Sequence, residues 1–200
     1  AEDGVTYNVY EDPRGDTRPW EVDLLPLVLG ADEWQWLSKA VAQRAELLDS
    51  VLGDLYGDQA LLKEGLMPPA LVYGQAGFQW PCQGIQPVSG RFLHLYAVDL
   101  ARAPDGGWWV MADRTQAPSG AGYALQNRLV ISRAFPAPFH NLPVTNLAEF
   151  FQGFQNSLAS MSPARNETAL CVLLTPGRFN ETYFEHVFLA RYLGLPLVEG

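Results

Sequence analysis

Lysine is scarce in this chain. Only Lys39 and Lys63 are lysines among the 13 basic residues, and the formal net charge is -9. Nucleic acids and anionic membranes need a broad positive field on their protein partners. We therefore expect neither as a partner, and any anionic ligand must be met locally.

The chain also has only two cysteines and no long apolar run. Cys82 and Cys171 have neither metal-ligand spacing nor the density of a secreted disulfide scaffold. No run of about 18 uncharged apolar residues exists, and no charged-then-apolar leader opens the chain. These absences predict a soluble, cytoplasmic protein with free thiols.

What the sequence does contain is enough apolar material for a core. Hydrophobic residues make up 48% of the 200 positions, six of them Trp, and no repeat period is present. Residues 5–10 alternate like an edge strand, and a helical apolar spacing begins at Ala31 and ends at Gly57. The Pro- and Gly-rich stretch 65–90 predicts a connection wrapped around other structure.

Asp105-Gly106 lies between two apolar runs. This dipeptide accepts the positive φ angles of tight hairpin turns, so we expect antiparallel strands at 91–101 and 107–113. Residues 128–133 are a candidate third strand. Together with the helices, these strands predict an α/β (α+β) fold.

The last third of the chain changes pattern. An amphipathic helix is expected within 144–161, capped by Thr145. A continuous apolar run, a helix capped by Asn180 and a second strand at 195–200 then predict a parallel, right-handed strand-helix-strand unit. So small a parallel sheet can hardly close its own core, and we expect the chain to continue past Gly200.

Asp99 and Asp113 are the first chemical candidates. They occupy adjacent predicted strands, six residues before Asp105 and seven after Gly106, so they can lie nearly side by side. Neighbouring carboxylates repel unless a divalent cation or an arginine lies between them. Arg102 and Arg114 are close enough to serve, so a metal site and a neutralised surface pair both remain open.

The turn PSGAG at 118–122 is the second candidate. Its glycines free the backbone, and its amides could hold an anion, although such turns are common and the phosphate-loop lysine motif is absent. Asn127 and Arg128 would add an oxygen ligand and a cation, or serve only as structural hydrogen-bonding residues. No nucleophile elbow exists, and a hydrolase using Cys82 with a distant histidine is the least favoured reading.

Several stretches together resemble a known family, the circularly permuted ATP-grasp proteins related to glutathionylspermidine synthetase. They are TYNVY, DLLPL, QRAELLDSVLGDLYG, LHLYAVDLAR, WWVMADRTQAPSGAGYALQNR and LLTPGRFNETYFEHVFLARYLGLPLVEG. The resemblance implies an ATP- and Mg²⁺-dependent carboxylate-amine ligase that forms peptide-type bonds through an acyl phosphate. Its substrates would be small-molecule or peptide carboxylates and amines.

The resemblance also implies roles for individual residues. Asp99 and Asp113 would hold metal, and Arg128 and Arg114 would steady the acyl phosphate. The nucleotide or substrate edge would include Ser119, Gly120, Gly122 and Asn127. Many relatives have Asn where this chain has Arg114, which puts one metal position in doubt unless Thr115 or Asn127 substitutes.

The resemblance finally predicts a division of the chain. Residues 1–165 would begin the permuted ATP-grasp domain, and 166–200 would begin a Rossmann-like unit. In such enzymes lysines of a separate lobe clamp the nucleotide, and neither lysine here matches that clamp. The resemblance therefore places the nucleotide-binding lobe in a C-terminal part of the chain beyond Gly200, and this piece alone would be inactive. The alternative is a noncatalytic binding module that keeps the fold.

Overall fold

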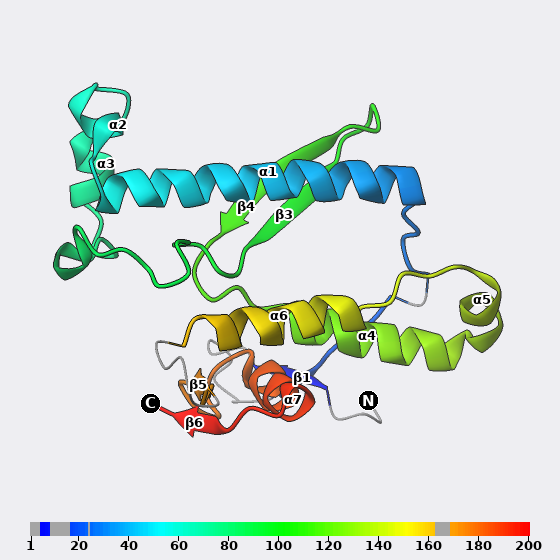
Figure 1. The fold of residues 1–200 in the computed structure, drawn as a ribbon. Coiled ribbons are helices and arrows are strands. Elements are labelled where there is room, and N and C mark those ends of the chain that lie inside the picture. Colours follow the sequence, from blue (N-terminus) through cyan, green and yellow to red (C-terminus); the bar gives the residue numbers. More distant parts are fainter. Residues whose placement is uncertain (1–4, 9–16, 24, 163–168) are drawn as a thin grey trace. The chain divides into compact units, whose positions relative to one another are not determined.

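A computed structural model describes residues 5–8, 17–23, 25–162 and 169–200 of the chain (Figure 1). The chain forms two compact units. Residues 28–118 make a helix-hairpin unit, and residues 1–27 with 119–200 make a terminal unit. The predicted boundary between residues 165 and 166 lies outside the described residues.

The helix-hairpin unit begins with the long helix α1, Ala31–Tyr56. Trp34 donates its backbone N–H to Gly30 at 2.9 Å, and the amide of Gly57 closes the other end on Asp54 at 3.0 Å. The predicted start and end of this helix are therefore confirmed. Of the apolar residues with helical spacing in α1, Leu37 is buried, whereas the side chain of Trp34 is 52% exposed.

The connection after α1 is held by the helix's own side chains. Asp54 accepts the amides of Ala60 and Leu61 at 2.7 and 3.0 Å, and Asp49 accepts two more at residues 92 and 93. The segment contains the short helices α2 (Ala60–Lys63) and α3 (Pro69–Tyr73) and a 3₁₀ turn (Trp80–Cys82). Stacked and edge-to-face contacts join its rings to α1 and to residue 92 in one aromatic cluster: Tyr56, Tyr73, Phe78, Trp80 and Phe92.

The predicted hairpin is present and shorter than expected at its start. Strands β3 (Ala97–Arg102) and β4 (Trp108–Arg114) pair antiparallel and run beside α1 (Figure 1). Gly106 has a φ of +84°, and the Asp105 carboxylate accepts the Gly107 amide at 2.9 Å, as the turn chemistry requires. The register shifts between Asp99 and Leu100, which marks a β-bulge.

The terminal unit joins both ends of the sequence. Strand β1 (Thr6–Asn8), which contains Tyr7, pairs antiparallel with β2 (Thr17–Pro19). Parallel strands β5 (Leu173–Thr175) and β6 (Leu197–Glu199) are connected through α7 (Tyr183–Leu193), which confirms the predicted strand-helix-strand unit. The remaining helices are α4 (Ala121–Ala134), α5 (Pro136–Asn141) and α6 (Ala148–Ser160).

Three of these helices share the core of the terminal unit. Leu125 from α4, Phe151 from α6 and Leu193 from α7 are buried together. Phe151 meets the ring of Tyr192 edge to face at 5.1 Å between centroids. This packing fixes α4 and α7 against each other, so the glycines that open α4 are held beside α7.

Two local predictions were wrong. Residues 128–133 form the second half of α4 rather than a strand, because the buried positions Gly122, Leu125 and Gln126 follow helical spacing that begins before the apolar run. Thr145 does not cap the following helix. That helix begins at Ala148, whose amide is accepted by the side chain of Asn146 at 2.8 Å.

The predicted helix cap at Asn180 was also wrong, because the last helix begins two residues later than expected. The cap position of α7 is Thr182, and Asn180 Oδ1 accepts that residue's N–H at 2.9 Å. The predicted strand at 5–10 is seen at Thr6–Asn8, and its last two residues lie outside the described part. Within that described part, no helix is both long enough and apolar enough to cross a membrane.

Candidate functional site

Asp99 and Asp113 lie on opposite faces of the hairpin. Val98 is paired with Asp113, and Asp99 with Ala112, so the two aspartates are one residue out of register. Because successive strand residues point to opposite faces, their carboxylates do not share a face. The expectation that the two side chains lie side by side is therefore corrected.

Asp113 faces helix α1. Arg44 donates Nε and Nη2 to the two carboxylate oxygens, each at 2.6 Å, and the Tyr96 hydroxyl donates to Oδ1. The hydrogen bonds from Arg44 and then Tyr96 lower the pKa of Asp113 to about 2. Burial, followed by the bond to Asp113, raises the pKa of Tyr96 to about 12. Asp113 is thus a fully ionised anchor between hairpin and helix.

Asp99 lies on the other face of the hairpin, where its carboxylate is bound by Arg114. Arg114 donates Nη2 to Oδ2 at 2.7 Å and Nε to both oxygens at 3.1 Å. These bonds lower the pKa of Asp99 and raise that of Arg114. Arg102, the other predicted partner, instead pairs with Glu33 of α1 at 2.9 Å. The interpretation as carboxylates neutralised by arginine therefore describes this hairpin.

A Mg²⁺ ion shared by Asp99 and Asp113 does not fit this arrangement. Mg²⁺ takes carboxylate oxygens in a tight octahedral shell. Here the two carboxylates face apart, and all four of their oxygens accept bonds from arginine. The described residues also contain no cluster of three or more His, Cys, Asp or Glu side chains suited to a metal.

The glycine turn does hold an anion, and the anion belongs to the chain. Glu185 of α7 accepts the Gly120 amide at 2.8 and 2.9 Å through its two oxygens, and the Gly122 amide at 2.7 Å through Oε1. Glu185 is only 2% exposed. In this structure the amides that were expected to hold an anionic ligand are therefore bonded to a side chain of the same chain, and the ligand-binding role of Gly120 and Gly122 stays a prediction.

Asn127 and Arg128 lie on α4, not in a loop. Asn127 accepts the indole N–H of Trp20 at 2.8 Å. Arg128 donates Nη1 to the Thr145 carbonyl at 3.1 Å, with its guanidinium 5.6 Å from the ring centre of Phe139. Both therefore have structural contacts, while the predicted ligand-binding residue Ser119 is exposed.

A second polar network lies at the carboxyl end of β5. Thr175 Oγ1 is 2.8 Å from His186 Nδ1 and accepts the Gly177 amide at 3.1 Å, while His186 Nε2 is 3.2 Å from Thr182 Oγ1. The Thr182 hydroxyl donates to Asn180. The single hydrogen of the Thr182 hydroxyl goes to Asn180, so in the neutral imidazole Nε2 donates to Thr182 and Nδ1 accepts from Thr175. Burial lowers the pKa of His186, against the opposing charge of Glu185.

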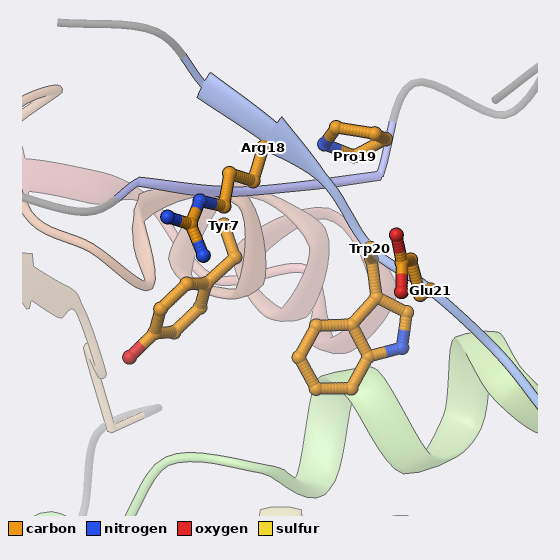
Figure 2. A pocket seen from close by; sticks show the side chains of 5 residues that line it. All are labelled: Tyr7, Arg18, Pro19, Trp20 and Glu21. Carbon is orange, nitrogen blue, oxygen red and sulfur yellow. The ribbon is translucent and has the colours of Figure 1, made fainter. Parts of the chain in front are cut away.

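An open hollow of about 330 Å³ lies along β2. Its lining comprises Tyr7, Arg18, Pro19, Trp20 and Glu21. Figure 2 shows the rings of Tyr7 and Trp20 extending to one side of the strand pair. The centroids of these two rings are 6.3 Å apart. Trp20 also stacks on Tyr123 of α4 at 4.3 Å, so this aromatic surface is continuous with that helix.

Comparison with known families decides the assignment. The family model of circularly permuted ATP-grasp type 2 matches residues 26–200. The chain belongs to this family. The ATP-grasp resemblance in the sequence is thereby confirmed, and the mixed helix and strand architecture agrees with an α/β ATP-grasp domain.

Relatives of this ATP-grasp chain are longer. An uncharacterized protein of Synechocystis is 38% identical over 197 residues, covering 98% of this chain and 41% of the relative. Two uncharacterized proteins of Mycobacterium tuberculosis are 39% and 35% identical, covering 99% and 98% of this chain but 23% and 35% of their own lengths. The chain thus spans less than half of each of these relatives.

Sequence reasoning missed three residues of this ATP-grasp chain that matter most to the candidate site. Arg44, Tyr96 and Glu185 lie 69, 17 and 63 to 65 residues from their partners along the sequence. The sequence placed Glu185 beside His186 on the predicted C-terminal helix and indicated no partner for its carboxylate. The signal that was available was the buried face of that helix, where a charged residue requires a partner.

Proposed function

We propose that the polypeptide containing this chain is an ATP-dependent carboxylate-amine ligase. Membership of the ATP-grasp family over residues 26–200 carries this proposal, since that family suggests ATP-dependent ligation in general. The finer reaction proposed is peptide-type bond formation between a small-molecule or peptide carboxylate and an amine. The nucleotide lobe would lie in the additional length seen in the relatives.

The proposed ligation proceeds in two steps. A carboxylate oxygen of the acid substrate attacks the γ-phosphorus of ATP, the bond to ADP breaks, and an acyl phosphate forms. The amine nitrogen then attacks the acyl carbon, the C–O bond to phosphate breaks, and the nitrogen loses a proton. Catalysis of such phosphoryl transfer depends on positioning and on stabilising negative charge.

Arg128 is the predicted acyl-phosphate contact best placed on this chain. One of its five N–H donors is used by the Thr145 carbonyl, and its guanidinium makes a cation–π contact with Phe139. Arg114 is committed to Asp99 through two nitrogens. We therefore assign Arg128 the larger effect on turnover, with Arg114 holding the hairpin end.

The test begins with the intact polypeptide and a search for its substrates. ADP release would be followed with pools of amino acids, peptides and polyamines, at saturating ATP and Mg²⁺. We expect ADP release that requires both an acid and an amine. No release with any pool would reject the ligase assignment.

Asp113 then separates a role in catalysis from a role in folding. Asp113→Asn removes the charge, and Arg44→Gln removes its ion-pair partner while leaving the carboxylate. If Asp113 acts on the nucleotide, we expect Asp113→Asn to lower turnover at least about 100-fold and Arg44→Gln less than about 10-fold. Equal losses in both variants would leave Asp113 with only its contact to α1.

A specific observation favours a second candidate function. The carboxylates of Asp99 and Asp113 and the amides of Gly120 and Gly122 are all occupied by partners within the chain. A fold stabilised in this way suits a noncatalytic binding module. Tight binding of ATP together with substrate-dependent turnover by the intact polypeptide would exclude this alternative.

A further inference from the structure

Glu185 occupies the position that an external anion would need at the glycine turn. Its carboxylate receives hydrogen bonds from the amides of Gly120 and Gly122 at 2.7 to 2.9 Å. These amides open helix α4, where the partial positive charge of the helix favours an anion. The geometry is that of an anion-binding turn with its ligand supplied from α7.

Burial shows that this contact is built into the fold rather than formed at the surface. Glu185 is 2% exposed, and a buried carboxylate is costly unless hydrogen bonds compensate for lost water. The backbone of the turn is adapted to it as well. Gly120 has a φ of +123°, and a Cβ added at Gly122 would lie 2.8 Å from Glu185 Cγ and 3.1 Å from Leu189 Cγ. No side chain larger than hydrogen fits at residue 122 beside Glu185 in this arrangement.

We propose that Glu185 is the resident anion of the glycine turn: it positions Gly120 and Gly122 at the start of α4 and closes the turn to phosphate groups. Glu185 is therefore a positioning residue. Helix α4 begins at these glycines and carries Asn127 and Arg128. The proposal stands independently of ligase activity.

The first experiment uses the unmodified polypeptide, so it does not depend on a variant folding. The amide resonances of Gly120 and Gly122 would be followed by NMR during titration with inorganic phosphate and with ADP. We expect neither resonance to shift specifically, because both amides are already bonded to Glu185. A saturable shift of both amides with phosphate would overturn the proposal.

The second experiment empties the site and refills it. Glu185→Ala should lower the melting temperature and acquire sensitivity to formate, a small carboxylate that can replace the missing group. Formate at matched ionic strength with chloride should recover part of the loss, restore slow exchange of the Gly120 and Gly122 amides, and leave the unmodified polypeptide unchanged. Equal effects of formate on both proteins would contradict a resident anion.

Two further variants control for folding. Glu185→Gln keeps the side-chain shape and removes the charge, so its Gly120 and Gly122 amides should exchange at least about tenfold faster even if Glu185→Ala fails to fold. Glu149→Gln alters an exposed glutamate in the first turn of α6, and it should show no such change. Unchanged exchange in Glu185→Gln would reject the role of the carboxylate charge.

Discussion

Gly122 shows how one missing methyl group sets the candidate site. In Gly122→Ala the new Cβ would collide with Glu185 Cγ at 2.8 Å, so the turn or α7 must move. We expect a loss of about 1–3 kcal/mol in the free energy of unfolding, as for other overpacked positions. Urea denaturation followed by circular dichroism measures it.

Gly153 provides the matched control for that substitution. It also lies in a helix, α6, but a Cβ there would meet nothing within 4 Å. Gly153→Ala should therefore stabilise by roughly 0.5–1 kcal/mol through helix propensity. If both alanine variants shifted stability in the same direction, the close packing of Gly122 on Glu185 would be wrong.

His186 predicts a pH dependence with a definite sign. Burial lowers its pKa in the folded chain, so the unfolded chain takes up a proton first as pH falls below about 6.5. Stability contributed by neutral His186 is full above that pH. It is lost as pH falls towards the folded pKa, at no more than about 1.4 kcal/mol per pH unit.

Urea midpoints between pH 8 and pH 5 would test this dependence. His186→Gln should flatten the decline below about pH 6.5, because Gln does not take up a proton in this range. His140→Gln, at an exposed histidine of α5, should leave the decline as it is. A decline that is identical in the unmodified protein and in His186→Gln would contradict the role of the histidine network.

At the scale of elements, neighbouring phenylalanines on α6 differ sharply in their surroundings. Phe151 is 3% exposed in the core shared with α4 and α7, whereas Phe150 is 51% exposed. Phe151→Ala should cost about 3–5 kcal/mol, and Phe150→Ala less than about 1 kcal/mol. Thermal unfolding of the two variants compares them directly, and equal losses would contradict the assigned face of α6.

The elements that sequence predicted well are those with local signals. Helix α1 has helical spacing and a terminal Gly57, and the β3–β4 hairpin has Asp105-Gly106, so each needs no distant partner to be recognised. Helix α4 was divided into a loop and a strand because Gly120 and Gly122 indicated a turn, and Val130 and Ile131 favour strands. Tertiary packing on α6 and α7 overrides that local preference.

The candidate site was less predictable than the fold. The sequence identified Asp99, Asp113 and the glycine turn, and it left open whether arginine or metal neutralises the aspartates. It did not indicate the β-bulge or the partner Arg44, because register and long-range pairing depend on the folded hairpin and α1. Roles for Asp99, Asp113, Arg114 and Arg128 in catalysis stay predictions.

At the scale of the whole molecule, many large apolar side chains of the described residues remain exposed. On the helix-hairpin unit, Trp36 is 58%, Trp109 66% and Met111 65% exposed. Exposed apolar side chains of this size are typical of surfaces that another chain segment or partner covers.

Oxygen transfer from the acid substrate to phosphate directly tests the proposed ligation through an acyl phosphate. The intact polypeptide would be given ATP, an amine and an acid substrate whose two carboxylate oxygens are both ¹⁸O, and the released phosphate would be analysed by mass spectrometry. We predict ADP and inorganic phosphate carrying one ¹⁸O atom for each amide bond formed. Amide formation with unlabelled phosphate, or with AMP and pyrophosphate, would contradict it.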